Sequence, residues 1–144
     1  MRGGTEVVVV VQREGKYLVL RRAPERLGYW SLVAGEVEPG ETPAVAARRE
    51  LWEEARLDVE VVELPAALSY SLLDDPPAVR ARYAPGVETV TVHPFRAEAA
   101  PGWEPVLDAE HDIYQWCNAE DAVQLLDYET LKDAVRIAER TVAS

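Results

Sequence analysis

Three glutamates, Glu50, Glu53 and Glu54, stand at helical spacing in the segment GEVEPGETPAVAARRELWEEARL, residues 35–57. In a helix, the rotation of about 100° per residue would place all three within one arc of about 100°. Carboxylates at this spacing repel one another by roughly a few tenths of a kcal/mol per pair, and the C-terminal half of a helix is unfavourable for acids. We therefore expect a compensating cation beside them.

The cation has two candidate sources. On a solvated helix face, the nearby arginines Arg48, Arg49 and Arg56 would screen the acids. In a metal site, a divalent ion would do so: Mg²⁺ prefers oxygen ligands, keeps several waters, and is usually held by one or two carboxylates plus substrate phosphates. The spacing alone leaves both explanations open.

The residues before the glutamates predict where the helix begins. Thr42 followed by Pro43 is typical of an N-cap and a first helical position, so we expect a helix over residues 43–56. The side of this helix away from the acids should pack on a sheet. Its apolar residues are Ala44, Leu51 and Ala55.

The rest of the chain predicts a mixed sheet flanked by helices. The expected strands span residues 7–11, 17–20, 31–34, 59–64, 68–73, 88–95 and 112–117, with a hairpin between the first two. A loop is expected from Asp74 to Gly86. Two helices should close the chain, over 119–126 with Asn118 as cap and over 131–140 with Thr130 as cap.

Composition excludes several classes of function. The 144 residues include 26 acidic and 15 basic side chains, and the formal charge of −11 repels nucleic acid polymers and anionic membranes. A polyanionic substrate must therefore be attracted by local cations. No apolar run approaches the roughly 20 residues of a membrane span, and the N-terminus lacks the layout of a signal peptide. We expect a single cytoplasmic domain over residues 1–144, in which the single cysteine, Cys117, is buried packing.

The segment as a whole resembles the Nudix box, the signature of hydrolases that act on nucleoside diphosphates linked to another moiety. The match runs from Gly35 through Glu41 to the Arg49-Glu50 pair, then to Glu53-Glu54 and a closing apolar residue. It implies a Nudix-type α/β/α sandwich with a mixed, partly antiparallel sheet. One position departs, because Arg56 stands where the box usually has a glycine; this predicts either a different helix end or modest strain at Arg56.

The resemblance also implies roles for the matching residues. The carbonyl of Gly35 and the carboxylates of Glu50, Glu53 and Glu54 would bind Mg²⁺ or Mn²⁺ ions that bridge a diphosphate. Such ions neutralise the diphosphate and lower the pKa of an attacking water. Arg49 would orient a neighbouring glutamate, and Glu41 would brace the corner between loop and helix.

The group that accepts the proton of the water is open at this stage. A box glutamate, Glu50 or Glu53, is one possibility. Glu110 is another, either as the base or as an additional metal ligand, and its alternative is a solvated loop acid. His111, next to it, is equally open to interpretation as a surface histidine.

Outside the box the chain looks like the dihydroneopterin triphosphate pyrophosphatase branch, on residues 28–35, 80–95 and 110–116. The implied reaction releases pyrophosphate and leaves the monophosphate. The resemblance puts Arg21, Arg80 and Arg82 on the triphosphate, with the alternative that the last two only decorate a polar loop. Three further candidates are Tyr29 and Trp30, which would stack on the heterocycle or belong to the core, and Ala34, where the branch can offer a hydroxyl.

Other readings of the box stay open. The same chemistry could act on a nucleoside triphosphate or a dinucleoside polyphosphate, because the box specifies the diphosphate and not the base. A Nudix-fold binding module without turnover is a third hypothesis, against which the presence of all three glutamates argues. The expected partner is a small polyphosphate, with no nucleic acid polymer and no membrane, and the expected assembly is a monomer or a homodimer.

Overall fold

The five consecutive valines of residues 7–11 lie in β1 (Thr5–Arg13), the middle strand of a mixed sheet. The structure is a computed structural model that describes residues 2–73 and 75–143, with the backbone alone at 142 and 143. β1 pairs in antiparallel fashion with β2 (Lys16–Arg22) and in parallel with β7 (Thr89–Glu98). The other strands are β3 (Trp30–Ser31), β4 (Val33–Glu36), β5 (Val62–Glu63), β6 (Leu68–Ser71) and β8 (His111–Cys117). The path β3-β2-β1-β7-β5 is joined by β4 at β1, β6 at β7 and β8 at β2.

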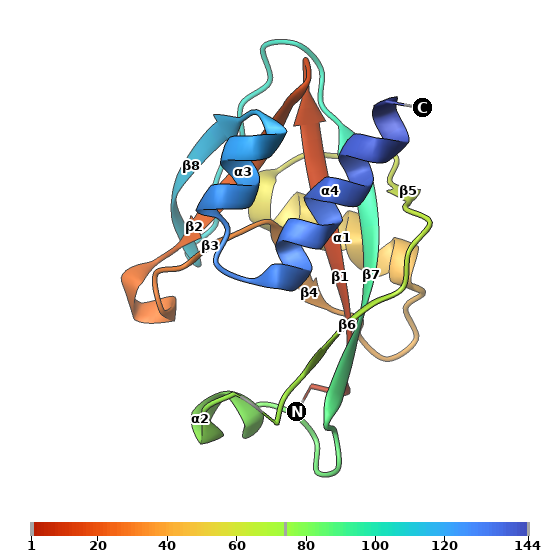
Figure 1. Cartoon of the computed structure of the whole chain (residues 1–144), viewed down its shortest axis with the longest axis vertical. Coiled ribbons are helices and arrows are strands. Elements are labelled where there is room, and N and C mark those ends of the chain that lie inside the picture. The colour runs from red at the N-terminus through yellow and green to blue at the C-terminus, as the bar shows by residue number, and fades with distance from the viewer. Residues whose placement is uncertain (1, 74, 144) are drawn as a thin grey trace.

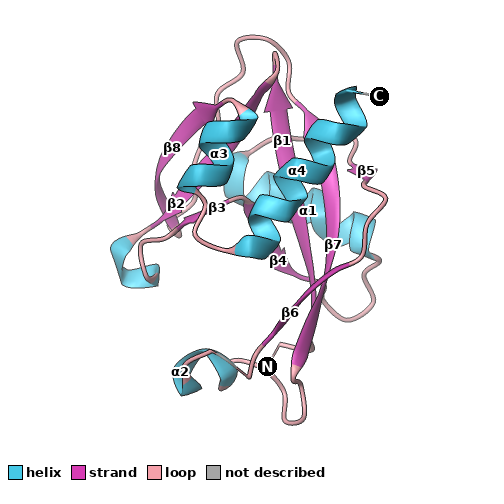
Figure 2. Ribbon diagram, in the orientation of Figure 1, coloured by secondary structure: helices cyan, strands magenta, loops and turns pink. Residues whose placement is uncertain are grey.

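Both faces of the sheet are covered by helices (Figure 1). Because side chains alternate along a strand, Val7, Val9 and Val11 pack toward one face, where α1 (Pro43–Ala55) lies. Val8 and Val10 pack toward the other face, under α3 (Ala119–Leu125) and α4 (Glu129–Ala143). The predicted α/β/α arrangement with a mixed, partly antiparallel sheet is confirmed, and Figure 2 shows the three layers.

Helix α1 begins as its sequence predicts. The Thr42 hydroxyl accepts a hydrogen bond from the Val45 amide at 3.2 Å. On its buried side Leu51 and Ala55 pack against the sheet, whereas the placement of Ala44 with them was wrong, because Ala44 is exposed. The helix ends at Arg56 in a left-handed conformation with φ of 60°. Arg56 therefore takes the conformation that glycine adopts without strain.

Four other elements differ from the sequence expectations. The single strand expected over 31–34 is two strands, β3, which pairs with β2, and β4, which pairs with β1. Only Val62–Glu63 of the strand expected over 59–64 pairs with a neighbour. The loop that leads to Gly86 contains a short helix, α2 (Pro77–Arg80), while residue 74 lies outside the described residues. Helix α4 begins at Glu129, so Thr130 is inside the helix and the assignment of Thr130 as its cap was wrong.

The cap of the preceding helix is confirmed. The side chain of Asn118 accepts a hydrogen bond from the Asp121 amide at 2.8 Å and so starts α3. A short 3₁₀ helix, η1 (Pro24–Arg26), follows β2. Within residues 2–73 and 75–143, no helix has the length and apolar character needed to span a membrane.

Candidate active site

The side chain of Arg49 forms hydrogen bonds with several glutamates of the box. Its guanidinium donates two hydrogen bonds to Glu41, at 2.8 and 2.9 Å, and further bonds to Glu50 at 2.8 Å and Glu53 at 3.2 Å. It also donates to the backbone carbonyl of Glu36 at 2.9 Å, which ties the end of β4 to α1. These bonds, first those to Glu41, raise the pKa of Arg49, and the same contact lowers the pKa of Glu41. Arg49 therefore holds Glu41, Glu50 and Glu53 together through direct hydrogen bonds.

Glu54 lies on the buried side of that cluster. Only 3% of Glu54 is exposed, and one carboxylate oxygen accepts a hydrogen bond from the Ala34 amide at 3.3 Å. Burial raises the pKa of Glu54 well above its ordinary value, and the neighbouring Glu50 adds to that effect. A solvated helix face does not describe this residue, because a carboxylate so enclosed needs a nearby cation to stay ionised.

The absence of a side chain at Gly35, near the end of β4, allows the Glu50 carboxylate to lie against the strand. A Cβ atom at Gly35 would lie 2.2 Å from Glu50 Oε1 and 2.3 Å from its carboxyl carbon. Any side chain at this position would therefore displace the Glu50 carboxylate. The close approach of the two explains a glycine here on steric grounds alone.

The donor atoms fit a hard divalent cation. Glu50, Glu53 and Glu54 offer carboxylate oxygens, with the Gly35 backbone beside them, and oxygen donors suit Mg²⁺ or Mn²⁺. Across the described parts of the chain, however, no three acidic, imidazole or thiol side chains are placed so that they could hold a metal ion by themselves. An ion held here by one or two of these carboxylates would complete its coordination with water and substrate phosphate, as Mg²⁺ commonly does.

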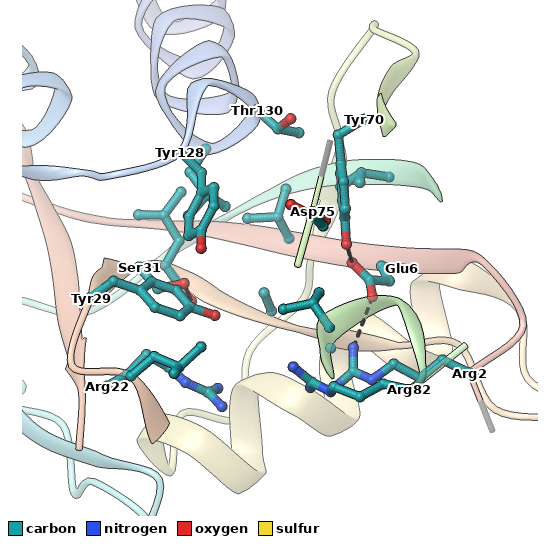
Figure 3. Close-up of a pocket in the computed structure, with 18 of the residues that line it drawn as sticks. Arg2, Glu6, Arg22, Tyr29, Ser31, Tyr70, Asp75, Arg82, Tyr128 and Thr130 are labelled. Atoms are coloured by element: carbon teal, nitrogen blue, oxygen red, sulfur yellow. Dashed lines mark hydrogen bonds and ion pairs between the residues drawn. The ribbon is translucent and has the colours of Figure 1, made fainter. Parts of the chain in front are cut away.

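A pocket of about 450 Å³ opens beside Glu54. Ala34, Gly35 and Glu54 are among its lining residues. Tyr29 and Tyr128 line it as well, and Figure 3 shows them next to each other. The rings of Tyr29 and Tyr128 meet edge to face, with centroids 4.9 Å apart. The pocket thus joins the acidic cluster to an aromatic surface.

Three arginines also line the pocket: Arg2, which is paired with Glu6, and Arg22 and Arg82. The guanidinium of Arg22 lies 5.7 Å from the centre of the Tyr29 ring, and Arg82 enters from the segment after α2. Arg22 also pairs with Glu110 at 3.7 Å. Among the described residues, Arg82 forms no side-chain ion pair, so its charge is available to an anion in the pocket.

The structure separates the predicted substrate residues into two groups. Tyr29, Ala34 and Arg82 line the pocket. Arg21 instead forms a two-point ion pair with Asp112, at 3.0 and 2.8 Å, and Trp30 packs partly buried against the core. Within the described chain, Arg21, Trp30 and Arg80 are not among the lining residues.

Glu110 and His111 are placed by different partners. Glu110 lies 3.7 Å from Arg22 and 3.4 Å from Arg26. The interpretation of His111 as a surface residue was wrong: its side chain is fully buried, with Nδ1 2.8 Å from Asp108 and Nε2 3.8 Å from Glu54. His111 therefore belongs to the environment of the acidic cluster.

The sequence analysis missed Arg22 in favour of its neighbour Arg21. The pairing of β2 with β8 is irregular between these two residues. Such a bulge breaks the alternation of side chains along a strand, and no residue type in the sequence marks it. Glu6, Tyr70, Tyr83 and Tyr128, which also line the pocket, come from distant segments that only the fold brings together.

Comparison with known proteins agrees with this geometry. The profile of the NUDIX domain matches residues 2–138. Dihydroneopterin triphosphate diphosphatase of Haemophilus influenzae is 30% identical over 135 residues, which are 90% of this chain and 82% of that protein. The Escherichia coli protein of the same name is 32% identical over 124 residues, 83% of this chain and 79% of its own.

A solved structure and a longer relative complete the comparison. The structure of the E. coli dihydroneopterin triphosphate pyrophosphohydrolase superposes with a TM-score of 0.82 at 27% identity, covering 96% of this chain and 97% of that one. An octanoyltransferase of Myxococcus xanthus is 34% identical over 125 residues, but this chain spans only 32% of its length. The match across residues 2–138, on a chain that buries a box glutamate beside an aromatic pocket, shows that this protein belongs to the Nudix hydrolase family.

Proposed function

We propose that this Nudix hydrolase releases pyrophosphate from dihydroneopterin triphosphate and leaves the monophosphate. The observation that carries the proposal is that Glu54, Arg82 and Tyr29 line one pocket. This pocket therefore offers an acid for a metal ion, a cation for phosphate and a ring for a planar heterocycle. Two relatives at 30% and 32% identity carry the name of this activity, which supports the choice of substrate.

The metal-binding part of the proposal uses the box. The Gly35 carbonyl and the carboxylates of Glu50, Glu53 and Glu54 would hold Mg²⁺, with Mn²⁺ as the alternative. When bound, such an ion offsets the charge of the diphosphate and activates water for attack. Arg49 acts as a positioning residue, because it holds Glu50 and Glu53 in place through hydrogen bonds of 2.8 and 3.2 Å.

The phosphates would be bound by arginines that face the pocket. Arg22 and Arg82 are the best placed, since both line it, and planar guanidinium groups match phosphate oxygens. Arg21, which is paired with Asp112, and Arg80 were expected in the same role but are not among the lining residues that the structure describes. Tyr29 and Tyr128 would contact the pterin face, and Ala34 leaves the pocket without the hydroxyl that the branch can offer.

The proton of the attacking water is assigned to a box glutamate, Glu53 ahead of Glu50. The Glu53 side chain is 51% exposed and touches Arg49 only at 3.2 Å, whereas Glu50 is enclosed by Gly35 and Arg49. Glu110 is assigned to holding Arg22, through their contact at 3.7 Å. On this assignment, Glu110→Gln raises KM and leaves kcat within about threefold, while Glu53→Gln lowers kcat.

A nucleoside triphosphate is the second candidate substrate, and a dinucleoside polyphosphate the third. The aromatic pair Tyr29 and Tyr128 favours planar rings without choosing among them. A non-catalytic module is disfavoured by the burial of Glu54 beside Glu50, because binding alone gives no reason to enclose two acids. We propose residues 1–144 as one catalytic domain, active as a monomer or a homodimer.

The test is pyrophosphate release from pterin, nucleoside and dinucleoside polyphosphates with Mg²⁺, Mn²⁺ or chelator. We expect dihydroneopterin triphosphate to have the highest kcat/KM, and Glu54→Gln to lose roughly a thousandfold in kcat. Glu60→Gln, on an exposed acid beyond the helix, is the matched control and should keep full activity. Full turnover by Glu54→Gln or in chelator would reject the metal role, and a preference for another substrate would reject the pterin assignment.

A further inference from the structure

A carboxylate and two tyrosines form one wall of the pocket. Tyr70 donates to Glu6 Oε1 at 2.6 Å, and Tyr83 donates to Glu6 Oε2 at 2.7 Å. The two phenol oxygens lie 2.9 Å from each other, and Arg2 pairs with Glu6 at 2.8 Å. All four residues line the pocket, and Figure 3 shows Tyr70 and Glu6 across it from Tyr29.

The hydroxyl protons of Tyr70 and Tyr83 are already used in hydrogen bonds within this wall. Burial, the largest effect on each, raises the pKa of both Tyr70 and Tyr83, so both phenols keep their single proton. Glu6, paired with the Arg2 guanidinium, takes both of these protons as hydrogen bonds. Whichever phenol donates across the 2.9 Å contact between them, two protons serve three short contacts, so neither phenol has a proton left for a ligand.

Two oxygen atoms that accept but cannot donate favour a ligand that brings its own N–H groups. An amino group directed at the Tyr70 and Tyr83 oxygens would supply the missing proton. A carbonyl oxygen at the same place would set lone pairs against lone pairs and would leave buried acceptors unpaired. Arg2 donates from Nη1 to Glu6 at 2.8 Å and, within the described residues, has no hydrogen bond to either phenol oxygen.

We propose that Glu6, Tyr70 and Tyr83 select substrates whose heterocycle carries an exocyclic amino group, as 2-amino-4-oxopteridine and guanine do. The inference rests on the proposed function for the position of the phosphates, since the glutamates at the other part of the pocket hold that end of the molecule. It adds a specificity that the aromatic pair does not provide, because Tyr29 and Tyr128 present rings to any planar base.

The test compares substrates that differ by that amino group. For the unmodified protein, kcat/KM for guanosine triphosphate should exceed that for inosine triphosphate by about tenfold or more. Tyr70→Phe removes one acceptor and should bring the ratio close to about twofold; Tyr83→Phe repeats the test on the other oxygen. The matched control is Tyr114→Phe, which also loses a phenol bond to a carboxylate, Glu104 at 2.9 Å, but on β8 outside the pocket lining; its ratio should stay that of the unmodified protein.

Binding of pterin and lumazine, heterocycles without phosphate that differ by an amino group against an oxo group, separates this inference from the proposed function. It is measured by fluorescence titration without metal. Tighter binding of pterin by about tenfold, with no turnover of any triphosphate, supports the wall and rejects the hydrolase proposal. If the protein turns over guanosine and inosine triphosphates equally and binds pterin and lumazine equally, the selection by Glu6, Tyr70 and Tyr83 is rejected. The hydrolase proposal then stands. A preference that persists in both phenylalanine variants also rejects that selection.

Discussion

At the scale of single residues, the members of the acidic cluster differ in whether an arginine reaches them. Arg49 contacts Glu41, Glu50 and Glu53 directly. Within the described residues, Glu54 forms no ion pair with an arginine; it lies beside the Ala34 amide, Glu50 and, at 3.8 Å, the buried His111. The residue that Arg49 does not reach is thus the one that most needs a metal ion to remain ionised.

Gly35 gives a direct test of how closely Glu50 must approach the strand. Gly35→Ala would place a Cβ atom 2.2 Å from Glu50 Oε1, and the flexible carboxylate would move away. We expect kcat to fall by roughly a hundredfold or more while the melting temperature changes little, because the end of a side chain yields more easily than backbone. Gly3→Ala, where nothing lies within 4 Å of the added atom, should leave both unchanged. Normal activity of Gly35→Ala would mean that the observed position of Glu50 is not needed.

At the scale of elements, helix α1 shows which structural features a sequence can specify. Thr42 and Pro43 predicted its start, because capping depends on neighbouring residues alone. For the end of the helix, the sequence left two possibilities: a different end point, or a strained conformation at Arg56. It could not choose between them, since the conformation of Arg56 depends on how the chain continues into the loop. The box glutamates could also be identified from the sequence, because their spacing depends only on neighbouring residues in one segment. The sequence could not show that a bulge next to Arg21 brings Arg22 into the pocket, or that Tyr70 and Tyr83 meet at Glu6.

The left-handed residue at the end of α1 should cost stability. A non-glycine residue at φ of 60° is disfavoured by about 1 kcal/mol, while the guanidinium of Arg56, 5.2 Å from the Trp52 ring centre, returns about 0.5 kcal/mol. We expect Arg56→Gly to raise the free energy of unfolding by about 0.5 kcal/mol, and Arg56→Ala, which loses the ring contact and keeps the strain, to lower it. Urea denaturation measures both. Glycine less stable than alanine at this position would contradict the argument.

At the scale of the whole molecule, the distribution of charge matters more than its sum. A protein with a formal charge of −11 repels a triphosphate at a distance, yet Arg22 and Arg82 line the pocket that should receive it. Salt screens the distant charges beyond about 8 Å and leaves the pocket charges less affected. The acidic surface therefore excludes polyanions in general, while the pocket admits one that fits it.

Acid should weaken the packing between β1 and β8 through Glu104. This carboxylate accepts hydrogen bonds from Arg13 on β1 at 2.5 Å and from Tyr114 and Trp116 on β8 at 2.9 and 3.0 Å. The contacts, first that with Arg13, lower the pKa of Glu104 from 4.5 to about 2. A folded-state pKa below the unfolded value gives stability that is complete above pH 4.5 and is lost as the pH falls toward 2.

The measurement is the urea midpoint of the unmodified protein and of Glu104→Gln between pH 7 and pH 2.5. The variant should be the less stable of the two at pH 7, because its amide cannot replace the ionised partner of Arg13. The difference should shrink below pH 4.5 as the carboxylate of the unmodified protein takes up its proton. Glu60→Gln, on an acid exposed to solvent, should follow the unmodified protein throughout. A gap between the Glu104→Gln variant and the unmodified protein that stays constant down to pH 2.5 would show that Glu104 joins these strands by shape and not by charge.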